Sequence, residues 1–346
     1  MRIDGFDFES KGTFIVAELS ANHRQKFDVA VETVKAAKSA GANAIKLQTY
    51  TAETLTIDCD NEFFKISGKT IWDGKTYYDL YKEAFTPWDW HPKLKTLAND
   101  LGLTCFSSPF DNTAVDFLEQ IGMPAYKIAS FEIVDLPLIE YVASKGKPII
   151  ISTGIASLEE ITEAVDVCKL AGNSQIALLK CTSQYPAPVK SANLGDIPRL
   201  ASLYNVMVGL SDHTMGITVP TAAVTMGARI IEKHLILDRG LGGPDSSFSL
   251  EPQEFSEMVR AVRETEMAIN TSNFELTDDV KRSRIFARSL FVVEDVLRGE
   301  YFTARNVKSI RPSYGLAPKY LNKIIGTKAR GDISRGTPLK WDMIDE

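Results

Sequence analysis

Two apolar runs end on histidines in this sequence: Val206-Met207-Val208-Gly209-Leu210-Ser211-Asp212-His213 and Ala228-Arg229-Ile230-Ile231-Glu232-Lys233-His234. Both are rich in β-branched and aliphatic residues, and a helix-like stretch separates them, which predicts consecutive strands of a buried parallel sheet. A right-handed β-α-β crossover brings the ends of such strands to the same rim. We therefore expect His213 and His234 to lie side by side, as a divalent metal would require. The alternative for each is a hydrogen-bonded histidine at the edge of the core.

The same unit of strand, polar loop and amphipathic helix repeats from residue 13 to about residue 270. Near-continuous apolar runs indicate strands that are covered on both faces. Eight such units over about 250 residues predict an α/β fold, a TIM (β/α)8 barrel rather than an open doubly wound sheet. The predicted strands are residues 14–17, 44–47, 104–106, 125–128, 148–151, 176–179, 206–208 and 229–231.

The repeat stops after a helix predicted from Pro252 to about Ile269, and Asn270-Thr271-Ser272-Asn273 is interpreted as the start of a linker. We expect a barrel domain over residues 1–270, a linker over 271–284 and a small β-rich module over 285–346, with strands at 289–293, 299–302 and 311–316. A long aromatic insertion, residues 50–86, follows the second strand. Its position predicts a functional segment on the barrel rim, and a packing excursion is the alternative.

Composition and charge indicate where the protein acts and what its tail binds. No secretory signal or membrane-length apolar run is evident, so the cytoplasm is expected, and the four cysteines, without paired spacing, are expected to be buried thiols. Residues 281–346 carry 14 Lys and Arg against 7 Asp and Glu, a net charge of +7, whereas residues 1–280 carry 25 against 38, a net charge of −13. The basic tail favours docking on the acidic body over nucleic-acid binding, because its charges are scattered.

Functional groups of a barrel lie at the carboxyl ends of its strands, so the first polar residues after each apolar run are the candidates. Lysines, hydroxyl groups and one carboxylate beside two imidazoles predict a site for a phosphorylated or carboxylated anion next to a metal, because buried lysines need anionic partners. Strand-end salt bridges are the alternative for each lysine. The set is Glu18, Lys46, Gln48, Ser107, Ser108, Lys127, Ser130, Ser152, Thr153, Lys180, Thr182, Ser183, Ser211, His213 and His234.

Two imidazoles form an open metal site, in which water and substrate oxygens would complete the coordination. Mixed nitrogen and oxygen ligands favour Mn²⁺, with Mg²⁺, Co²⁺ or Fe²⁺ as alternatives. Asp245, in Gly242-Gly243-Pro244-Asp245-Ser246, is a candidate for holding a water or a substrate hydroxyl nearby. An Asp that caps a turn is the alternative, which we favour slightly.

Ordered motifs along nearly the whole chain resemble the sialic acid synthase family, which condenses phosphoenolpyruvate with an amino sugar. The motifs are Ala17-Glu18-Leu19-Ser20-Ala21-Asn22-His23, Lys46-Leu47-Gln48-Thr49, Ser107-Ser108-Pro109-Phe110, Tyr126-Lys127-Ile128-Ala129-Ser130, Ser152-Thr153-Gly154, Lys180-Cys181-Thr182-Ser183, Ser211-Asp212-His213, Glu232-Lys233-His234 and Arg311-Pro312-Ser313. The tail is similar to the family's antifreeze-like (SAF) domain. The resemblance implies a domain-swapped homodimer in which Arg311 reaches the partner's active site.

Two motifs depart from those of N-acetylneuraminate synthases and bear on which sugar is the substrate. This chain has Glu18-Leu19-Ser20-Ala21-Asn22-His23-Arg24-Gln25 where N-acetylneuraminate synthases have Glu-Ile-Gly-x-Asn-His-x-Gly, and Arg311-Pro312-Ser313-Tyr314-Gly315-Leu316 where they have Arg-Pro-Gly-x-Gly-Ile. Both variants resemble the pseudaminic acid synthase branch, whose sugar is 2,4-diacetamido-2,4,6-trideoxy-L-altrose. Synthases of N-acetylneuraminate or legionaminate, a Schiff-base aldolase and a non-catalytic scaffold that binds polysaccharide or nucleic acid are the alternatives.

The resemblance also assigns roles to individual residues. It implies catalytic roles for Glu18, His213, His234 and Arg311, with the two histidines as metal ligands. Glu18 would position a substrate hydroxyl or the attacking water, its alternative being a salt bridge to a strand-end lysine. Phosphoenolpyruvate and the amino-sugar aldose would be bound by Lys46, Gln48, Ser108, Lys127, Ser130, Ser152, Lys180, Ser183, Tyr185, Ser211 and Asp245.

Overall fold

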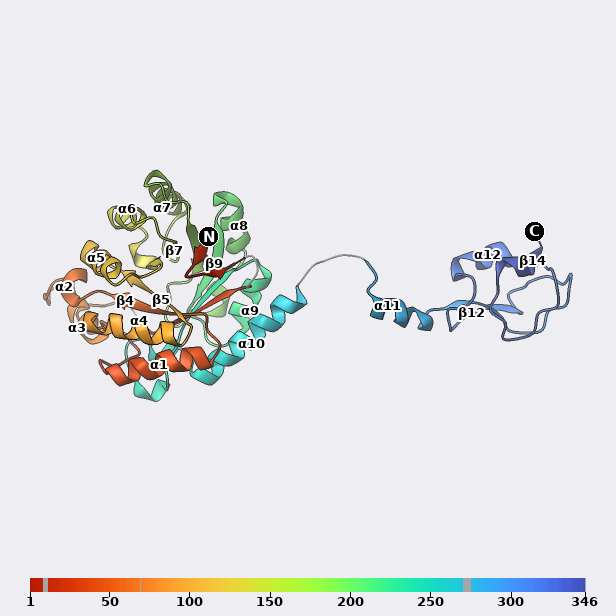
Figure 1. The fold of residues 1–346 in the computed structure, drawn as a ribbon, viewed down its shortest axis with the longest axis horizontal. Helices are drawn as coiled ribbons and strands as arrows, with labels where there is room; N and C mark the ends of the chain where they lie inside the picture. The colour runs from red at the N-terminus through yellow and green to blue at the C-terminus, as the bar shows by residue number, and fades with distance from the viewer. Residues whose placement is uncertain (9–11, 69, 270–274, 346) are drawn as a thin grey trace. The chain divides into compact units, whose positions relative to one another are not determined.

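The computed structural model describes residues 1–8, 12–68, 70–269 and 275–345. The chain divides into two compact units, residues 1–270 and 271–346. Figure 1 shows a strand barrel ringed by helices in the first unit and a smaller, loop-rich second unit. The predicted linker start, residues 270–273, lies outside the described residues. No helix in the described ranges has both the length and the apolar character needed to cross a bilayer.

Eight parallel strands close the first unit into the predicted barrel, in the order β10-β3-β4-β5-β6-β7-β8-β9 (Figure 1). Most of them run further than predicted at their carboxyl ends, because the ladder of backbone hydrogen bonds continues through the polar residues, for example where Gln48 pairs with Ser108. The strands are β3 (Phe14–Glu18), β4 (Ala44–Thr49), β5 (Thr104–Pro109), β6 (Tyr126–Ile128), β7 (Ile149–Ser152), β8 (Ile176–Cys181), β9 (Met207–Asp212) and β10 (Ile230–His234).

Helices cover the outside of the barrel and bury one apolar face each against it. Two glycines with positive φ, Gly41 (+89°) and Gly172 (+82°), follow α1 and α7, because a left-handed residue after a helix favours glycine. The helices of this ring are α1 (Phe27–Ser39), α4 (His91–Asp100), α5 (Asn112–Gln120), α6 (Leu136–Ala143), α7 (Leu158–Leu170), α8 (Asp196–Tyr204), α9 (Thr218–Thr225) and α10 (Pro252–Ala268).

A hairpin at the start of the chain plugs the amino-terminal mouth of the barrel. It consists of β1 (Arg2–Ile3) and β2 (Phe6–Asp7), which pair antiparallel. The ring of Phe6 lies 4.7 Å from that of Phe14, and both belong to the apolar cluster inside the barrel. Because this mouth is filled, the opposite mouth, at the carboxyl ends of the strands, is the one left for a ligand.

The predicted long insertion is structured. It contains α2 (Ala52–Leu55) and α3 (Tyr77–Ala84), and an isolated bridge joins Lys65 to Thr76. The side chain of Thr76 caps α3 by accepting a hydrogen bond from the backbone N–H of Asp79 at 3.1 Å. The insertion therefore presents a packed wall rather than a loose loop at the rim.

The second unit has its own apolar core. Its strands are β11 (Ser289–Val292), β12 (Val307–Ile310), β13 (Lys328–Ala329) and β14 (Ile344–Asp345), and its helices are α11 (Asp278–Ser283) and α12 (Leu321–Ile324). Helix α11 replaces part of the predicted linker, because Thr277 caps it. Two predicted strands are wrong: residues 299–302 contribute an isolated bridge at Tyr301, and residues 311–316 contain Pro312, which cannot donate to a ladder.

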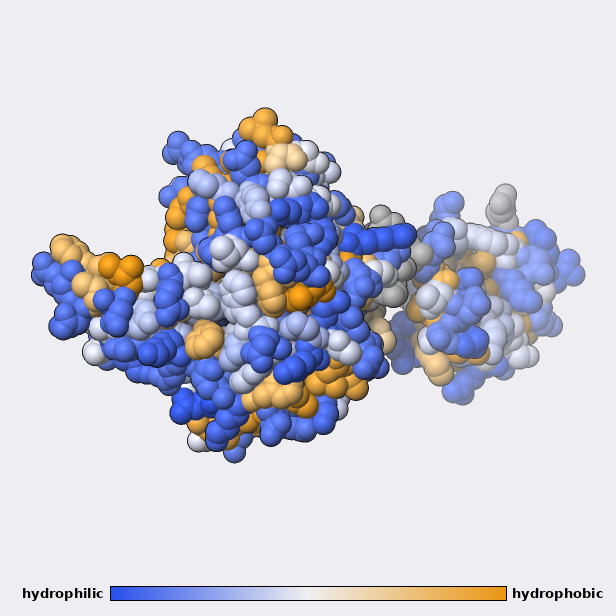
Figure 2. Space-filling model, turned by 60° about the vertical axis from the view of Figure 1, so that its left-hand side comes forward, coloured by the Kyte–Doolittle hydropathy of each residue, from blue (hydrophilic) through white to orange (hydrophobic). Residues whose placement is uncertain are grey.

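The surface seen in Figure 2 is mostly hydrophilic, and its hydrophobic residues form small, separate groups. Three of the four cysteines, Cys105, Cys168 and Cys181, are buried as predicted. Cys59 is partly exposed, because it lies in the insertion rather than in a strand or helix, so the prediction of a buried thiol is wrong there.

Candidate active site

A cavity of about 500 Å³ opens at the carboxyl ends of the barrel strands and is walled on one side by the insertion. This size is typical of small-molecule sites. Most of the predicted site residues line it, namely Glu18, Lys46, Gln48, Lys127, Ser130, Ser152, Tyr185, Ser211, His213, His234 and Asp245. The barrel geometry thus brings together residues that are spread over more than two hundred positions of the chain.

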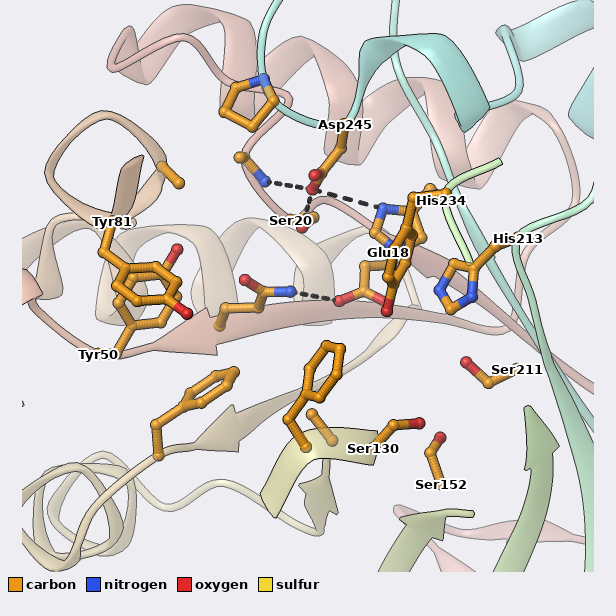
Figure 3. Close-up of a pocket in the computed structure, with 18 of the residues that line it drawn as sticks. Glu18, Ser20, Tyr50, Tyr81, Ser130, Ser152, Ser211, His213, His234 and Asp245 are labelled. Carbon is orange, nitrogen blue, oxygen red and sulfur yellow. Dashed lines mark hydrogen bonds and ion pairs between the residues drawn. The ribbon is translucent and has the colours of Figure 1, made fainter. Parts of the chain in front are cut away.

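His213 and His234 lie side by side in this cavity, with ring centroids 5.2 Å apart (Figure 3). The Nδ1 of His213 lies 3.1 Å from the carbonyl oxygen of Thr182, to which it donates, so the lone pair of its Nε2 remains for a ligand. The Nδ1 of His234 is buried without a hydrogen-bond partner among the described residues. Two imidazoles that each keep a nitrogen for a ligand fit the predicted metal.

The protein groups around the two rings fit a metal site in which protein side chains provide only part of the coordination. Oε2 of Glu18 lies 3.4 Å from His234 Nε2, and Oδ2 of Asp245 lies 3.7 Å from His234 Nδ1. Burial, with smaller contributions from His213 and Lys46, lowers the pKa of His234 against the effect of these carboxylates and so favours the neutral ring that ligation requires. Within the described ranges, His, Cys, Asp and Glu side chains form no cluster of three or more that could hold a metal ion alone. Solvent or substrate oxygens would have to complete the coordination.

A buried network of four charges lies at the base of the cavity. The Nζ of Lys46 lies 3.0 Å from Oε1 of Glu18 and 3.2 Å from Oε1 of Glu232. The Nζ of Lys127 lies 3.5 Å from the same Glu232 oxygen, which also accepts a hydrogen bond from Ser211 at 3.0 Å. The salt bridge that was the alternative role of Glu18 therefore exists, and it leaves Oε2 of Glu18 facing His234.

Burial and neighbouring charges shift the pKa values of the network's members to different extents. Burial raises the pKa of Glu18, but the charges of Lys46, His234 and Lys127 and the hydrogen bond from Gln48 together outweigh burial and hold this pKa below its usual range. Burial lowers the pKa of Lys127 more than Glu232 raises it. Because Lys127 has the longer contact and the lowered pKa, it is the ammonium with most to gain from an anionic ligand.

Several buried hydroxyls at or just after the carboxyl ends of the strands lack partners. In the part of the chain that the structure describes, the buried Oγ atoms of Ser108, Ser152 and Ser183 make no hydrogen bond, while Ser130 Oγ accepts one from the backbone N–H of Gly154 at 3.2 Å. Buried polar groups without partners cost free energy unless a ligand satisfies them. Their concentration here points to a polar ligand, such as phosphate or carboxylate.

Lys180, one of the predicted residues of the barrel, lies outside the cavity. Lys180 projects from the outer face of β8, where its Nζ lies 3.0 Å from Asp196 of α8, because Leu179 and Cys181 occupy the inward positions of the strand. Its predicted contact with substrate is wrong. Arg311 belongs to the second unit and follows β12 with an exposed side chain.

The prediction that Asp245 caps a turn is also wrong. Its side chain makes no capping bond to the described helical turn that follows it, residues 246–248. Oδ2 of Asp245 instead accepts a hydrogen bond from the hydroxyl of Ser20, two residues after β3 (Figure 3). The carboxylate is thereby held at the cavity wall next to His234, where it can hold a water or a substrate hydroxyl.

Sequence reasoning missed two acidic residues of the site. Glu232 lies two positions before His234 on β10 and therefore shares its inward face, a signal that strand alternation could have provided. Lys233 between them points outward to Asp212 at 2.5 Å. Glu132 lines the cavity after β6, and its buried Oε2 has no hydrogen-bond partner within the described ranges. No pattern in the sequence distinguishes Glu132 from a surface acid.

Comparisons with known proteins identify the family of the chain. The model of the NeuB family matches residues 33–273, and that of the SAF domain matches residues 287–345. A pseudaminic acid synthase of Campylobacter jejuni is 46% identical over 340 residues, which cover 98% of each chain. An N,N'-diacetyllegionaminic acid synthase of Legionella pneumophila is 37% identical over 337 residues, covering 96% of this chain and 94% of the relative.

Solved structures show the same architecture. An N-acetylneuraminic acid synthetase from Leptospira borgpetersenii, crystallised with citrate, superposes with a TM-score of 0.71 at 33% identity. The superposition covers 79% of this chain and 90% of that one.

Proposed function

The chain belongs to the NeuB family of synthases and ends in a SAF domain, and from this premise we propose that it condenses phosphoenolpyruvate with 2,4-diacetamido-2,4,6-trideoxy-L-altrose and water to give pseudaminic acid and phosphate. The observation that carries the choice of sugar is the 46% identity to a pseudaminic acid synthase over 98% of both chains, against 37% for the legionaminic acid synthase. The site supports the chemistry, because paired imidazoles adjoin a cradle of hydroxyl and ammonium groups.

In the proposed reaction, the methylene carbon of phosphoenolpyruvate attacks the aldehyde carbon of the open-chain sugar and forms the new C–C bond. The positive charge that develops at C2 is removed when water adds there and releases a proton. The C–O bond to the phosphate then breaks, and inorganic phosphate leaves. A divalent cation held by His213 and His234, for which we favour Mn²⁺ with Mg²⁺ or Co²⁺ as alternatives, would supply Lewis acidity at the aldehyde oxygen.

The protein's own groups have separable tasks in this scheme. Lys127 and the hydroxyls of Ser130, Ser152 and Ser183 would hold the phosphate and carboxylate of phosphoenolpyruvate. Glu18 is the candidate for orienting the attacking water, because Gln48 donates a hydrogen bond to its Oε1 at 2.8 Å and leaves Oε2 toward the histidines. Near-normal turnover of a Glu18→Gln variant would contradict this role.

We also propose a cellular compartment, an oligomeric state and a role for Arg311. The enzyme would act in the cytoplasm as a domain-swapped homodimer in which Arg311 supplies a fixed cation to the partner's anionic substrate. The opposite charges of residues 281–346 and of the rest of the chain, +7 and −13, support such docking.

A phosphate-release assay tests the proposed function. Purified protein is incubated with phosphoenolpyruvate, Mn²⁺ and, in separate reactions, the diacetamido-trideoxy altrose, its legionaminate-type isomer and N-acetylmannosamine. We expect the first sugar to release phosphate fastest and EDTA to abolish release. Faster release with another sugar would reassign the substrate. Inactivation by borohydride without metal dependence would instead support an imine-forming aldolase.

Gly154 leaves room for the anion cradle. A Cβ at this position would lie 2.2 Å from Ser183 Oγ and 2.7 Å from Ser130 Oγ, so Gly154→Ala would displace both hydroxyls. We expect the KM for phosphoenolpyruvate to rise about tenfold or more, because one or two hydrogen bonds to a charged group are lost. The control is Gly195→Ala, where a Cβ meets no described atom within 4 Å. Equal KM values for the two variants would contradict the assigned cradle.

Glu132 makes stability depend on pH. Burial raises its pKa from 4.5 to about 7, against the lowering effect of Lys127. The protonated form is thus favoured in the folded state, and its contribution to stability is lost as pH rises through about 7. Between about pH 5 and pH 8 we expect the wild type to lose at most about 3 kcal/mol more than Glu132→Gln. Urea midpoints at both pH values measure this, and parallel losses would rule it out.

A further inference from the structure

The active-site cavity has two chemically different halves. Around His213 and His234 it is lined by polar groups from the strand ends together with the rings of Tyr185 and Phe248. The other half is lined by side chains of the insertion and of the segments after β4 and β5, and we call it the apolar half: Tyr50, Leu55, Leu80, Tyr81, Ala84 and Phe110. Figure 3 shows Tyr50 and Tyr81 on the side of the pocket away from His213 and His234. A ligand that reacts beside the histidines can therefore extend into hydrocarbon surroundings.

The apolar half is a packed surface. The ring of Tyr50 meets that of Phe110 edge-on at 5.0 Å and that of Tyr81 at 5.8 Å. Leu80 and Ala84 are each 7% exposed and occupy adjacent turns of one face of α3. Because these side chains brace one another, the wall is formed before a ligand arrives.

The side chains of this wall favour particular groups at the end of the sugar that lies away from the reacting aldehyde. Apart from the hydroxyls of Tyr50 and Tyr81, its side chains are hydrocarbon and cannot satisfy a sugar hydroxyl. Contact of a methyl group with the same side chains lowers the free energy, because it removes apolar surface from water. We propose that the apolar half is the specificity-determining subsite of the reaction, which accepts the C6 methyl and the methyl of the 4-acetamido group and disfavours sugars with hydroxyls there. This inference rests on the proposed function and deepens it.

The size of the discrimination follows from the type of wall. A hydrophobic pocket disfavours an added hydroxyl by about a hundredfold at most, and one methylene in such a pocket is worth about tenfold or more. We therefore expect kcat/KM for the diacetamido-trideoxy sugar to exceed that for its 6-hydroxy analogue by about tenfold to a hundredfold. This comparison uses the unmodified enzyme and does not depend on any variant folding.

Two variants test the wall directly. Ala84→Ser adds a hydroxyl with little change in size, and Leu80→Asn places an amide among the apolar side chains. Each is expected to lower the ratio of kcat/KM for the 6-deoxy over the 6-hydroxy sugar by about tenfold, while the KM for phosphoenolpyruvate, which binds in the polar half, stays unchanged. The matched control is Ala164→Ser, at a buried alanine of α7 outside the cavity. It should leave the ratio as it is.

The outcomes separate this inference from the proposed function. If the wild type favours the 6-deoxy sugar and only the cavity variants reduce that preference, the subsite is supported. If the wild type uses both sugars equally, or the variants slow both sugars to the same extent, the inference is wrong although the enzyme is still a synthase. If the wild type releases no phosphate with the diacetamido-trideoxy sugar, the proposed function itself is wrong.

Discussion

Replacing His234 with alanine is expected to lower kcat/KM by about a thousandfold or more, because a metal ligand contributes several kcal/mol of charge stabilisation and about 1.4 kcal/mol corresponds to tenfold. The fold should survive. The Nδ1 of His234 is one of the buried atoms without a partner among the described residues, so removing the ring also removes an unsatisfied group. Steady-state kinetics with saturating Mn²⁺ measures the effect on turnover. Calorimetric titration of Mn²⁺ into the apoprotein should show weakened binding in the same variant.

The contrasting variant is His91→Ala. His91 is buried outside the cavity, and its Nε2 lies 2.9 Å from the hydroxyl of Thr49. Its loss should lower the melting temperature because Thr49 loses a partner, while kcat/KM of the folded enzyme stays within about threefold of the wild type. A His234→Ala enzyme with wild-type Mn²⁺ affinity, or with turnover close to that of the wild type, would remove this histidine from the metal site.

Replacing Glu232 with glutamine is expected to destabilise the barrel by about 3 kcal/mol or more. Oε1 of Glu232 lies close to the Nζ atoms of both Lys46 and Lys127, and all three side chains are 2% exposed. Without this carboxylate, two buried ammonium groups share Glu18 alone, and removing one partner of a buried ion pair typically costs about 3–5 kcal/mol. Activity should fall as well, because Lys127 would lose the carboxylate that holds its ammonium group in position.

The free energy of unfolding of Glu232→Gln is measured by urea titration with circular dichroism. Glu264→Gln serves as the control, because Glu264 is 65% exposed and its pair with Arg260, at 3.9 Å, is screened by solvent. We expect this control to unfold at the wild-type urea concentration. If Glu232→Gln also unfolded at the wild-type urea concentration, the ion pairs of Glu232 with Lys46 and Lys127 would not stabilise the barrel.

Much of the fold was predictable because its signals are local. Each buried parallel strand appears as a short apolar run, and each helix end at Gly41 and Gly172 carries the glycine that a left-handed residue needs. The pairing of His213 with His234 followed from the handedness of a single crossover. The short strands of the second unit were harder to predict, because two-residue strands such as β13 have no periodicity to recognise.

The order of residues along the chain was thus sufficient for the barrel, for the rim that holds the site and for most of the side chains that line it. Which side of each strand faces inward depended on the folded structure. Strands buried on both faces show no alternation in hydrophobicity, so the register against neighbouring strands decides that Lys180 points out of the cavity. The apolar wall of the insertion likewise exists only where distant segments pack together, since its composition alone is equally compatible with an ordinary surface excursion.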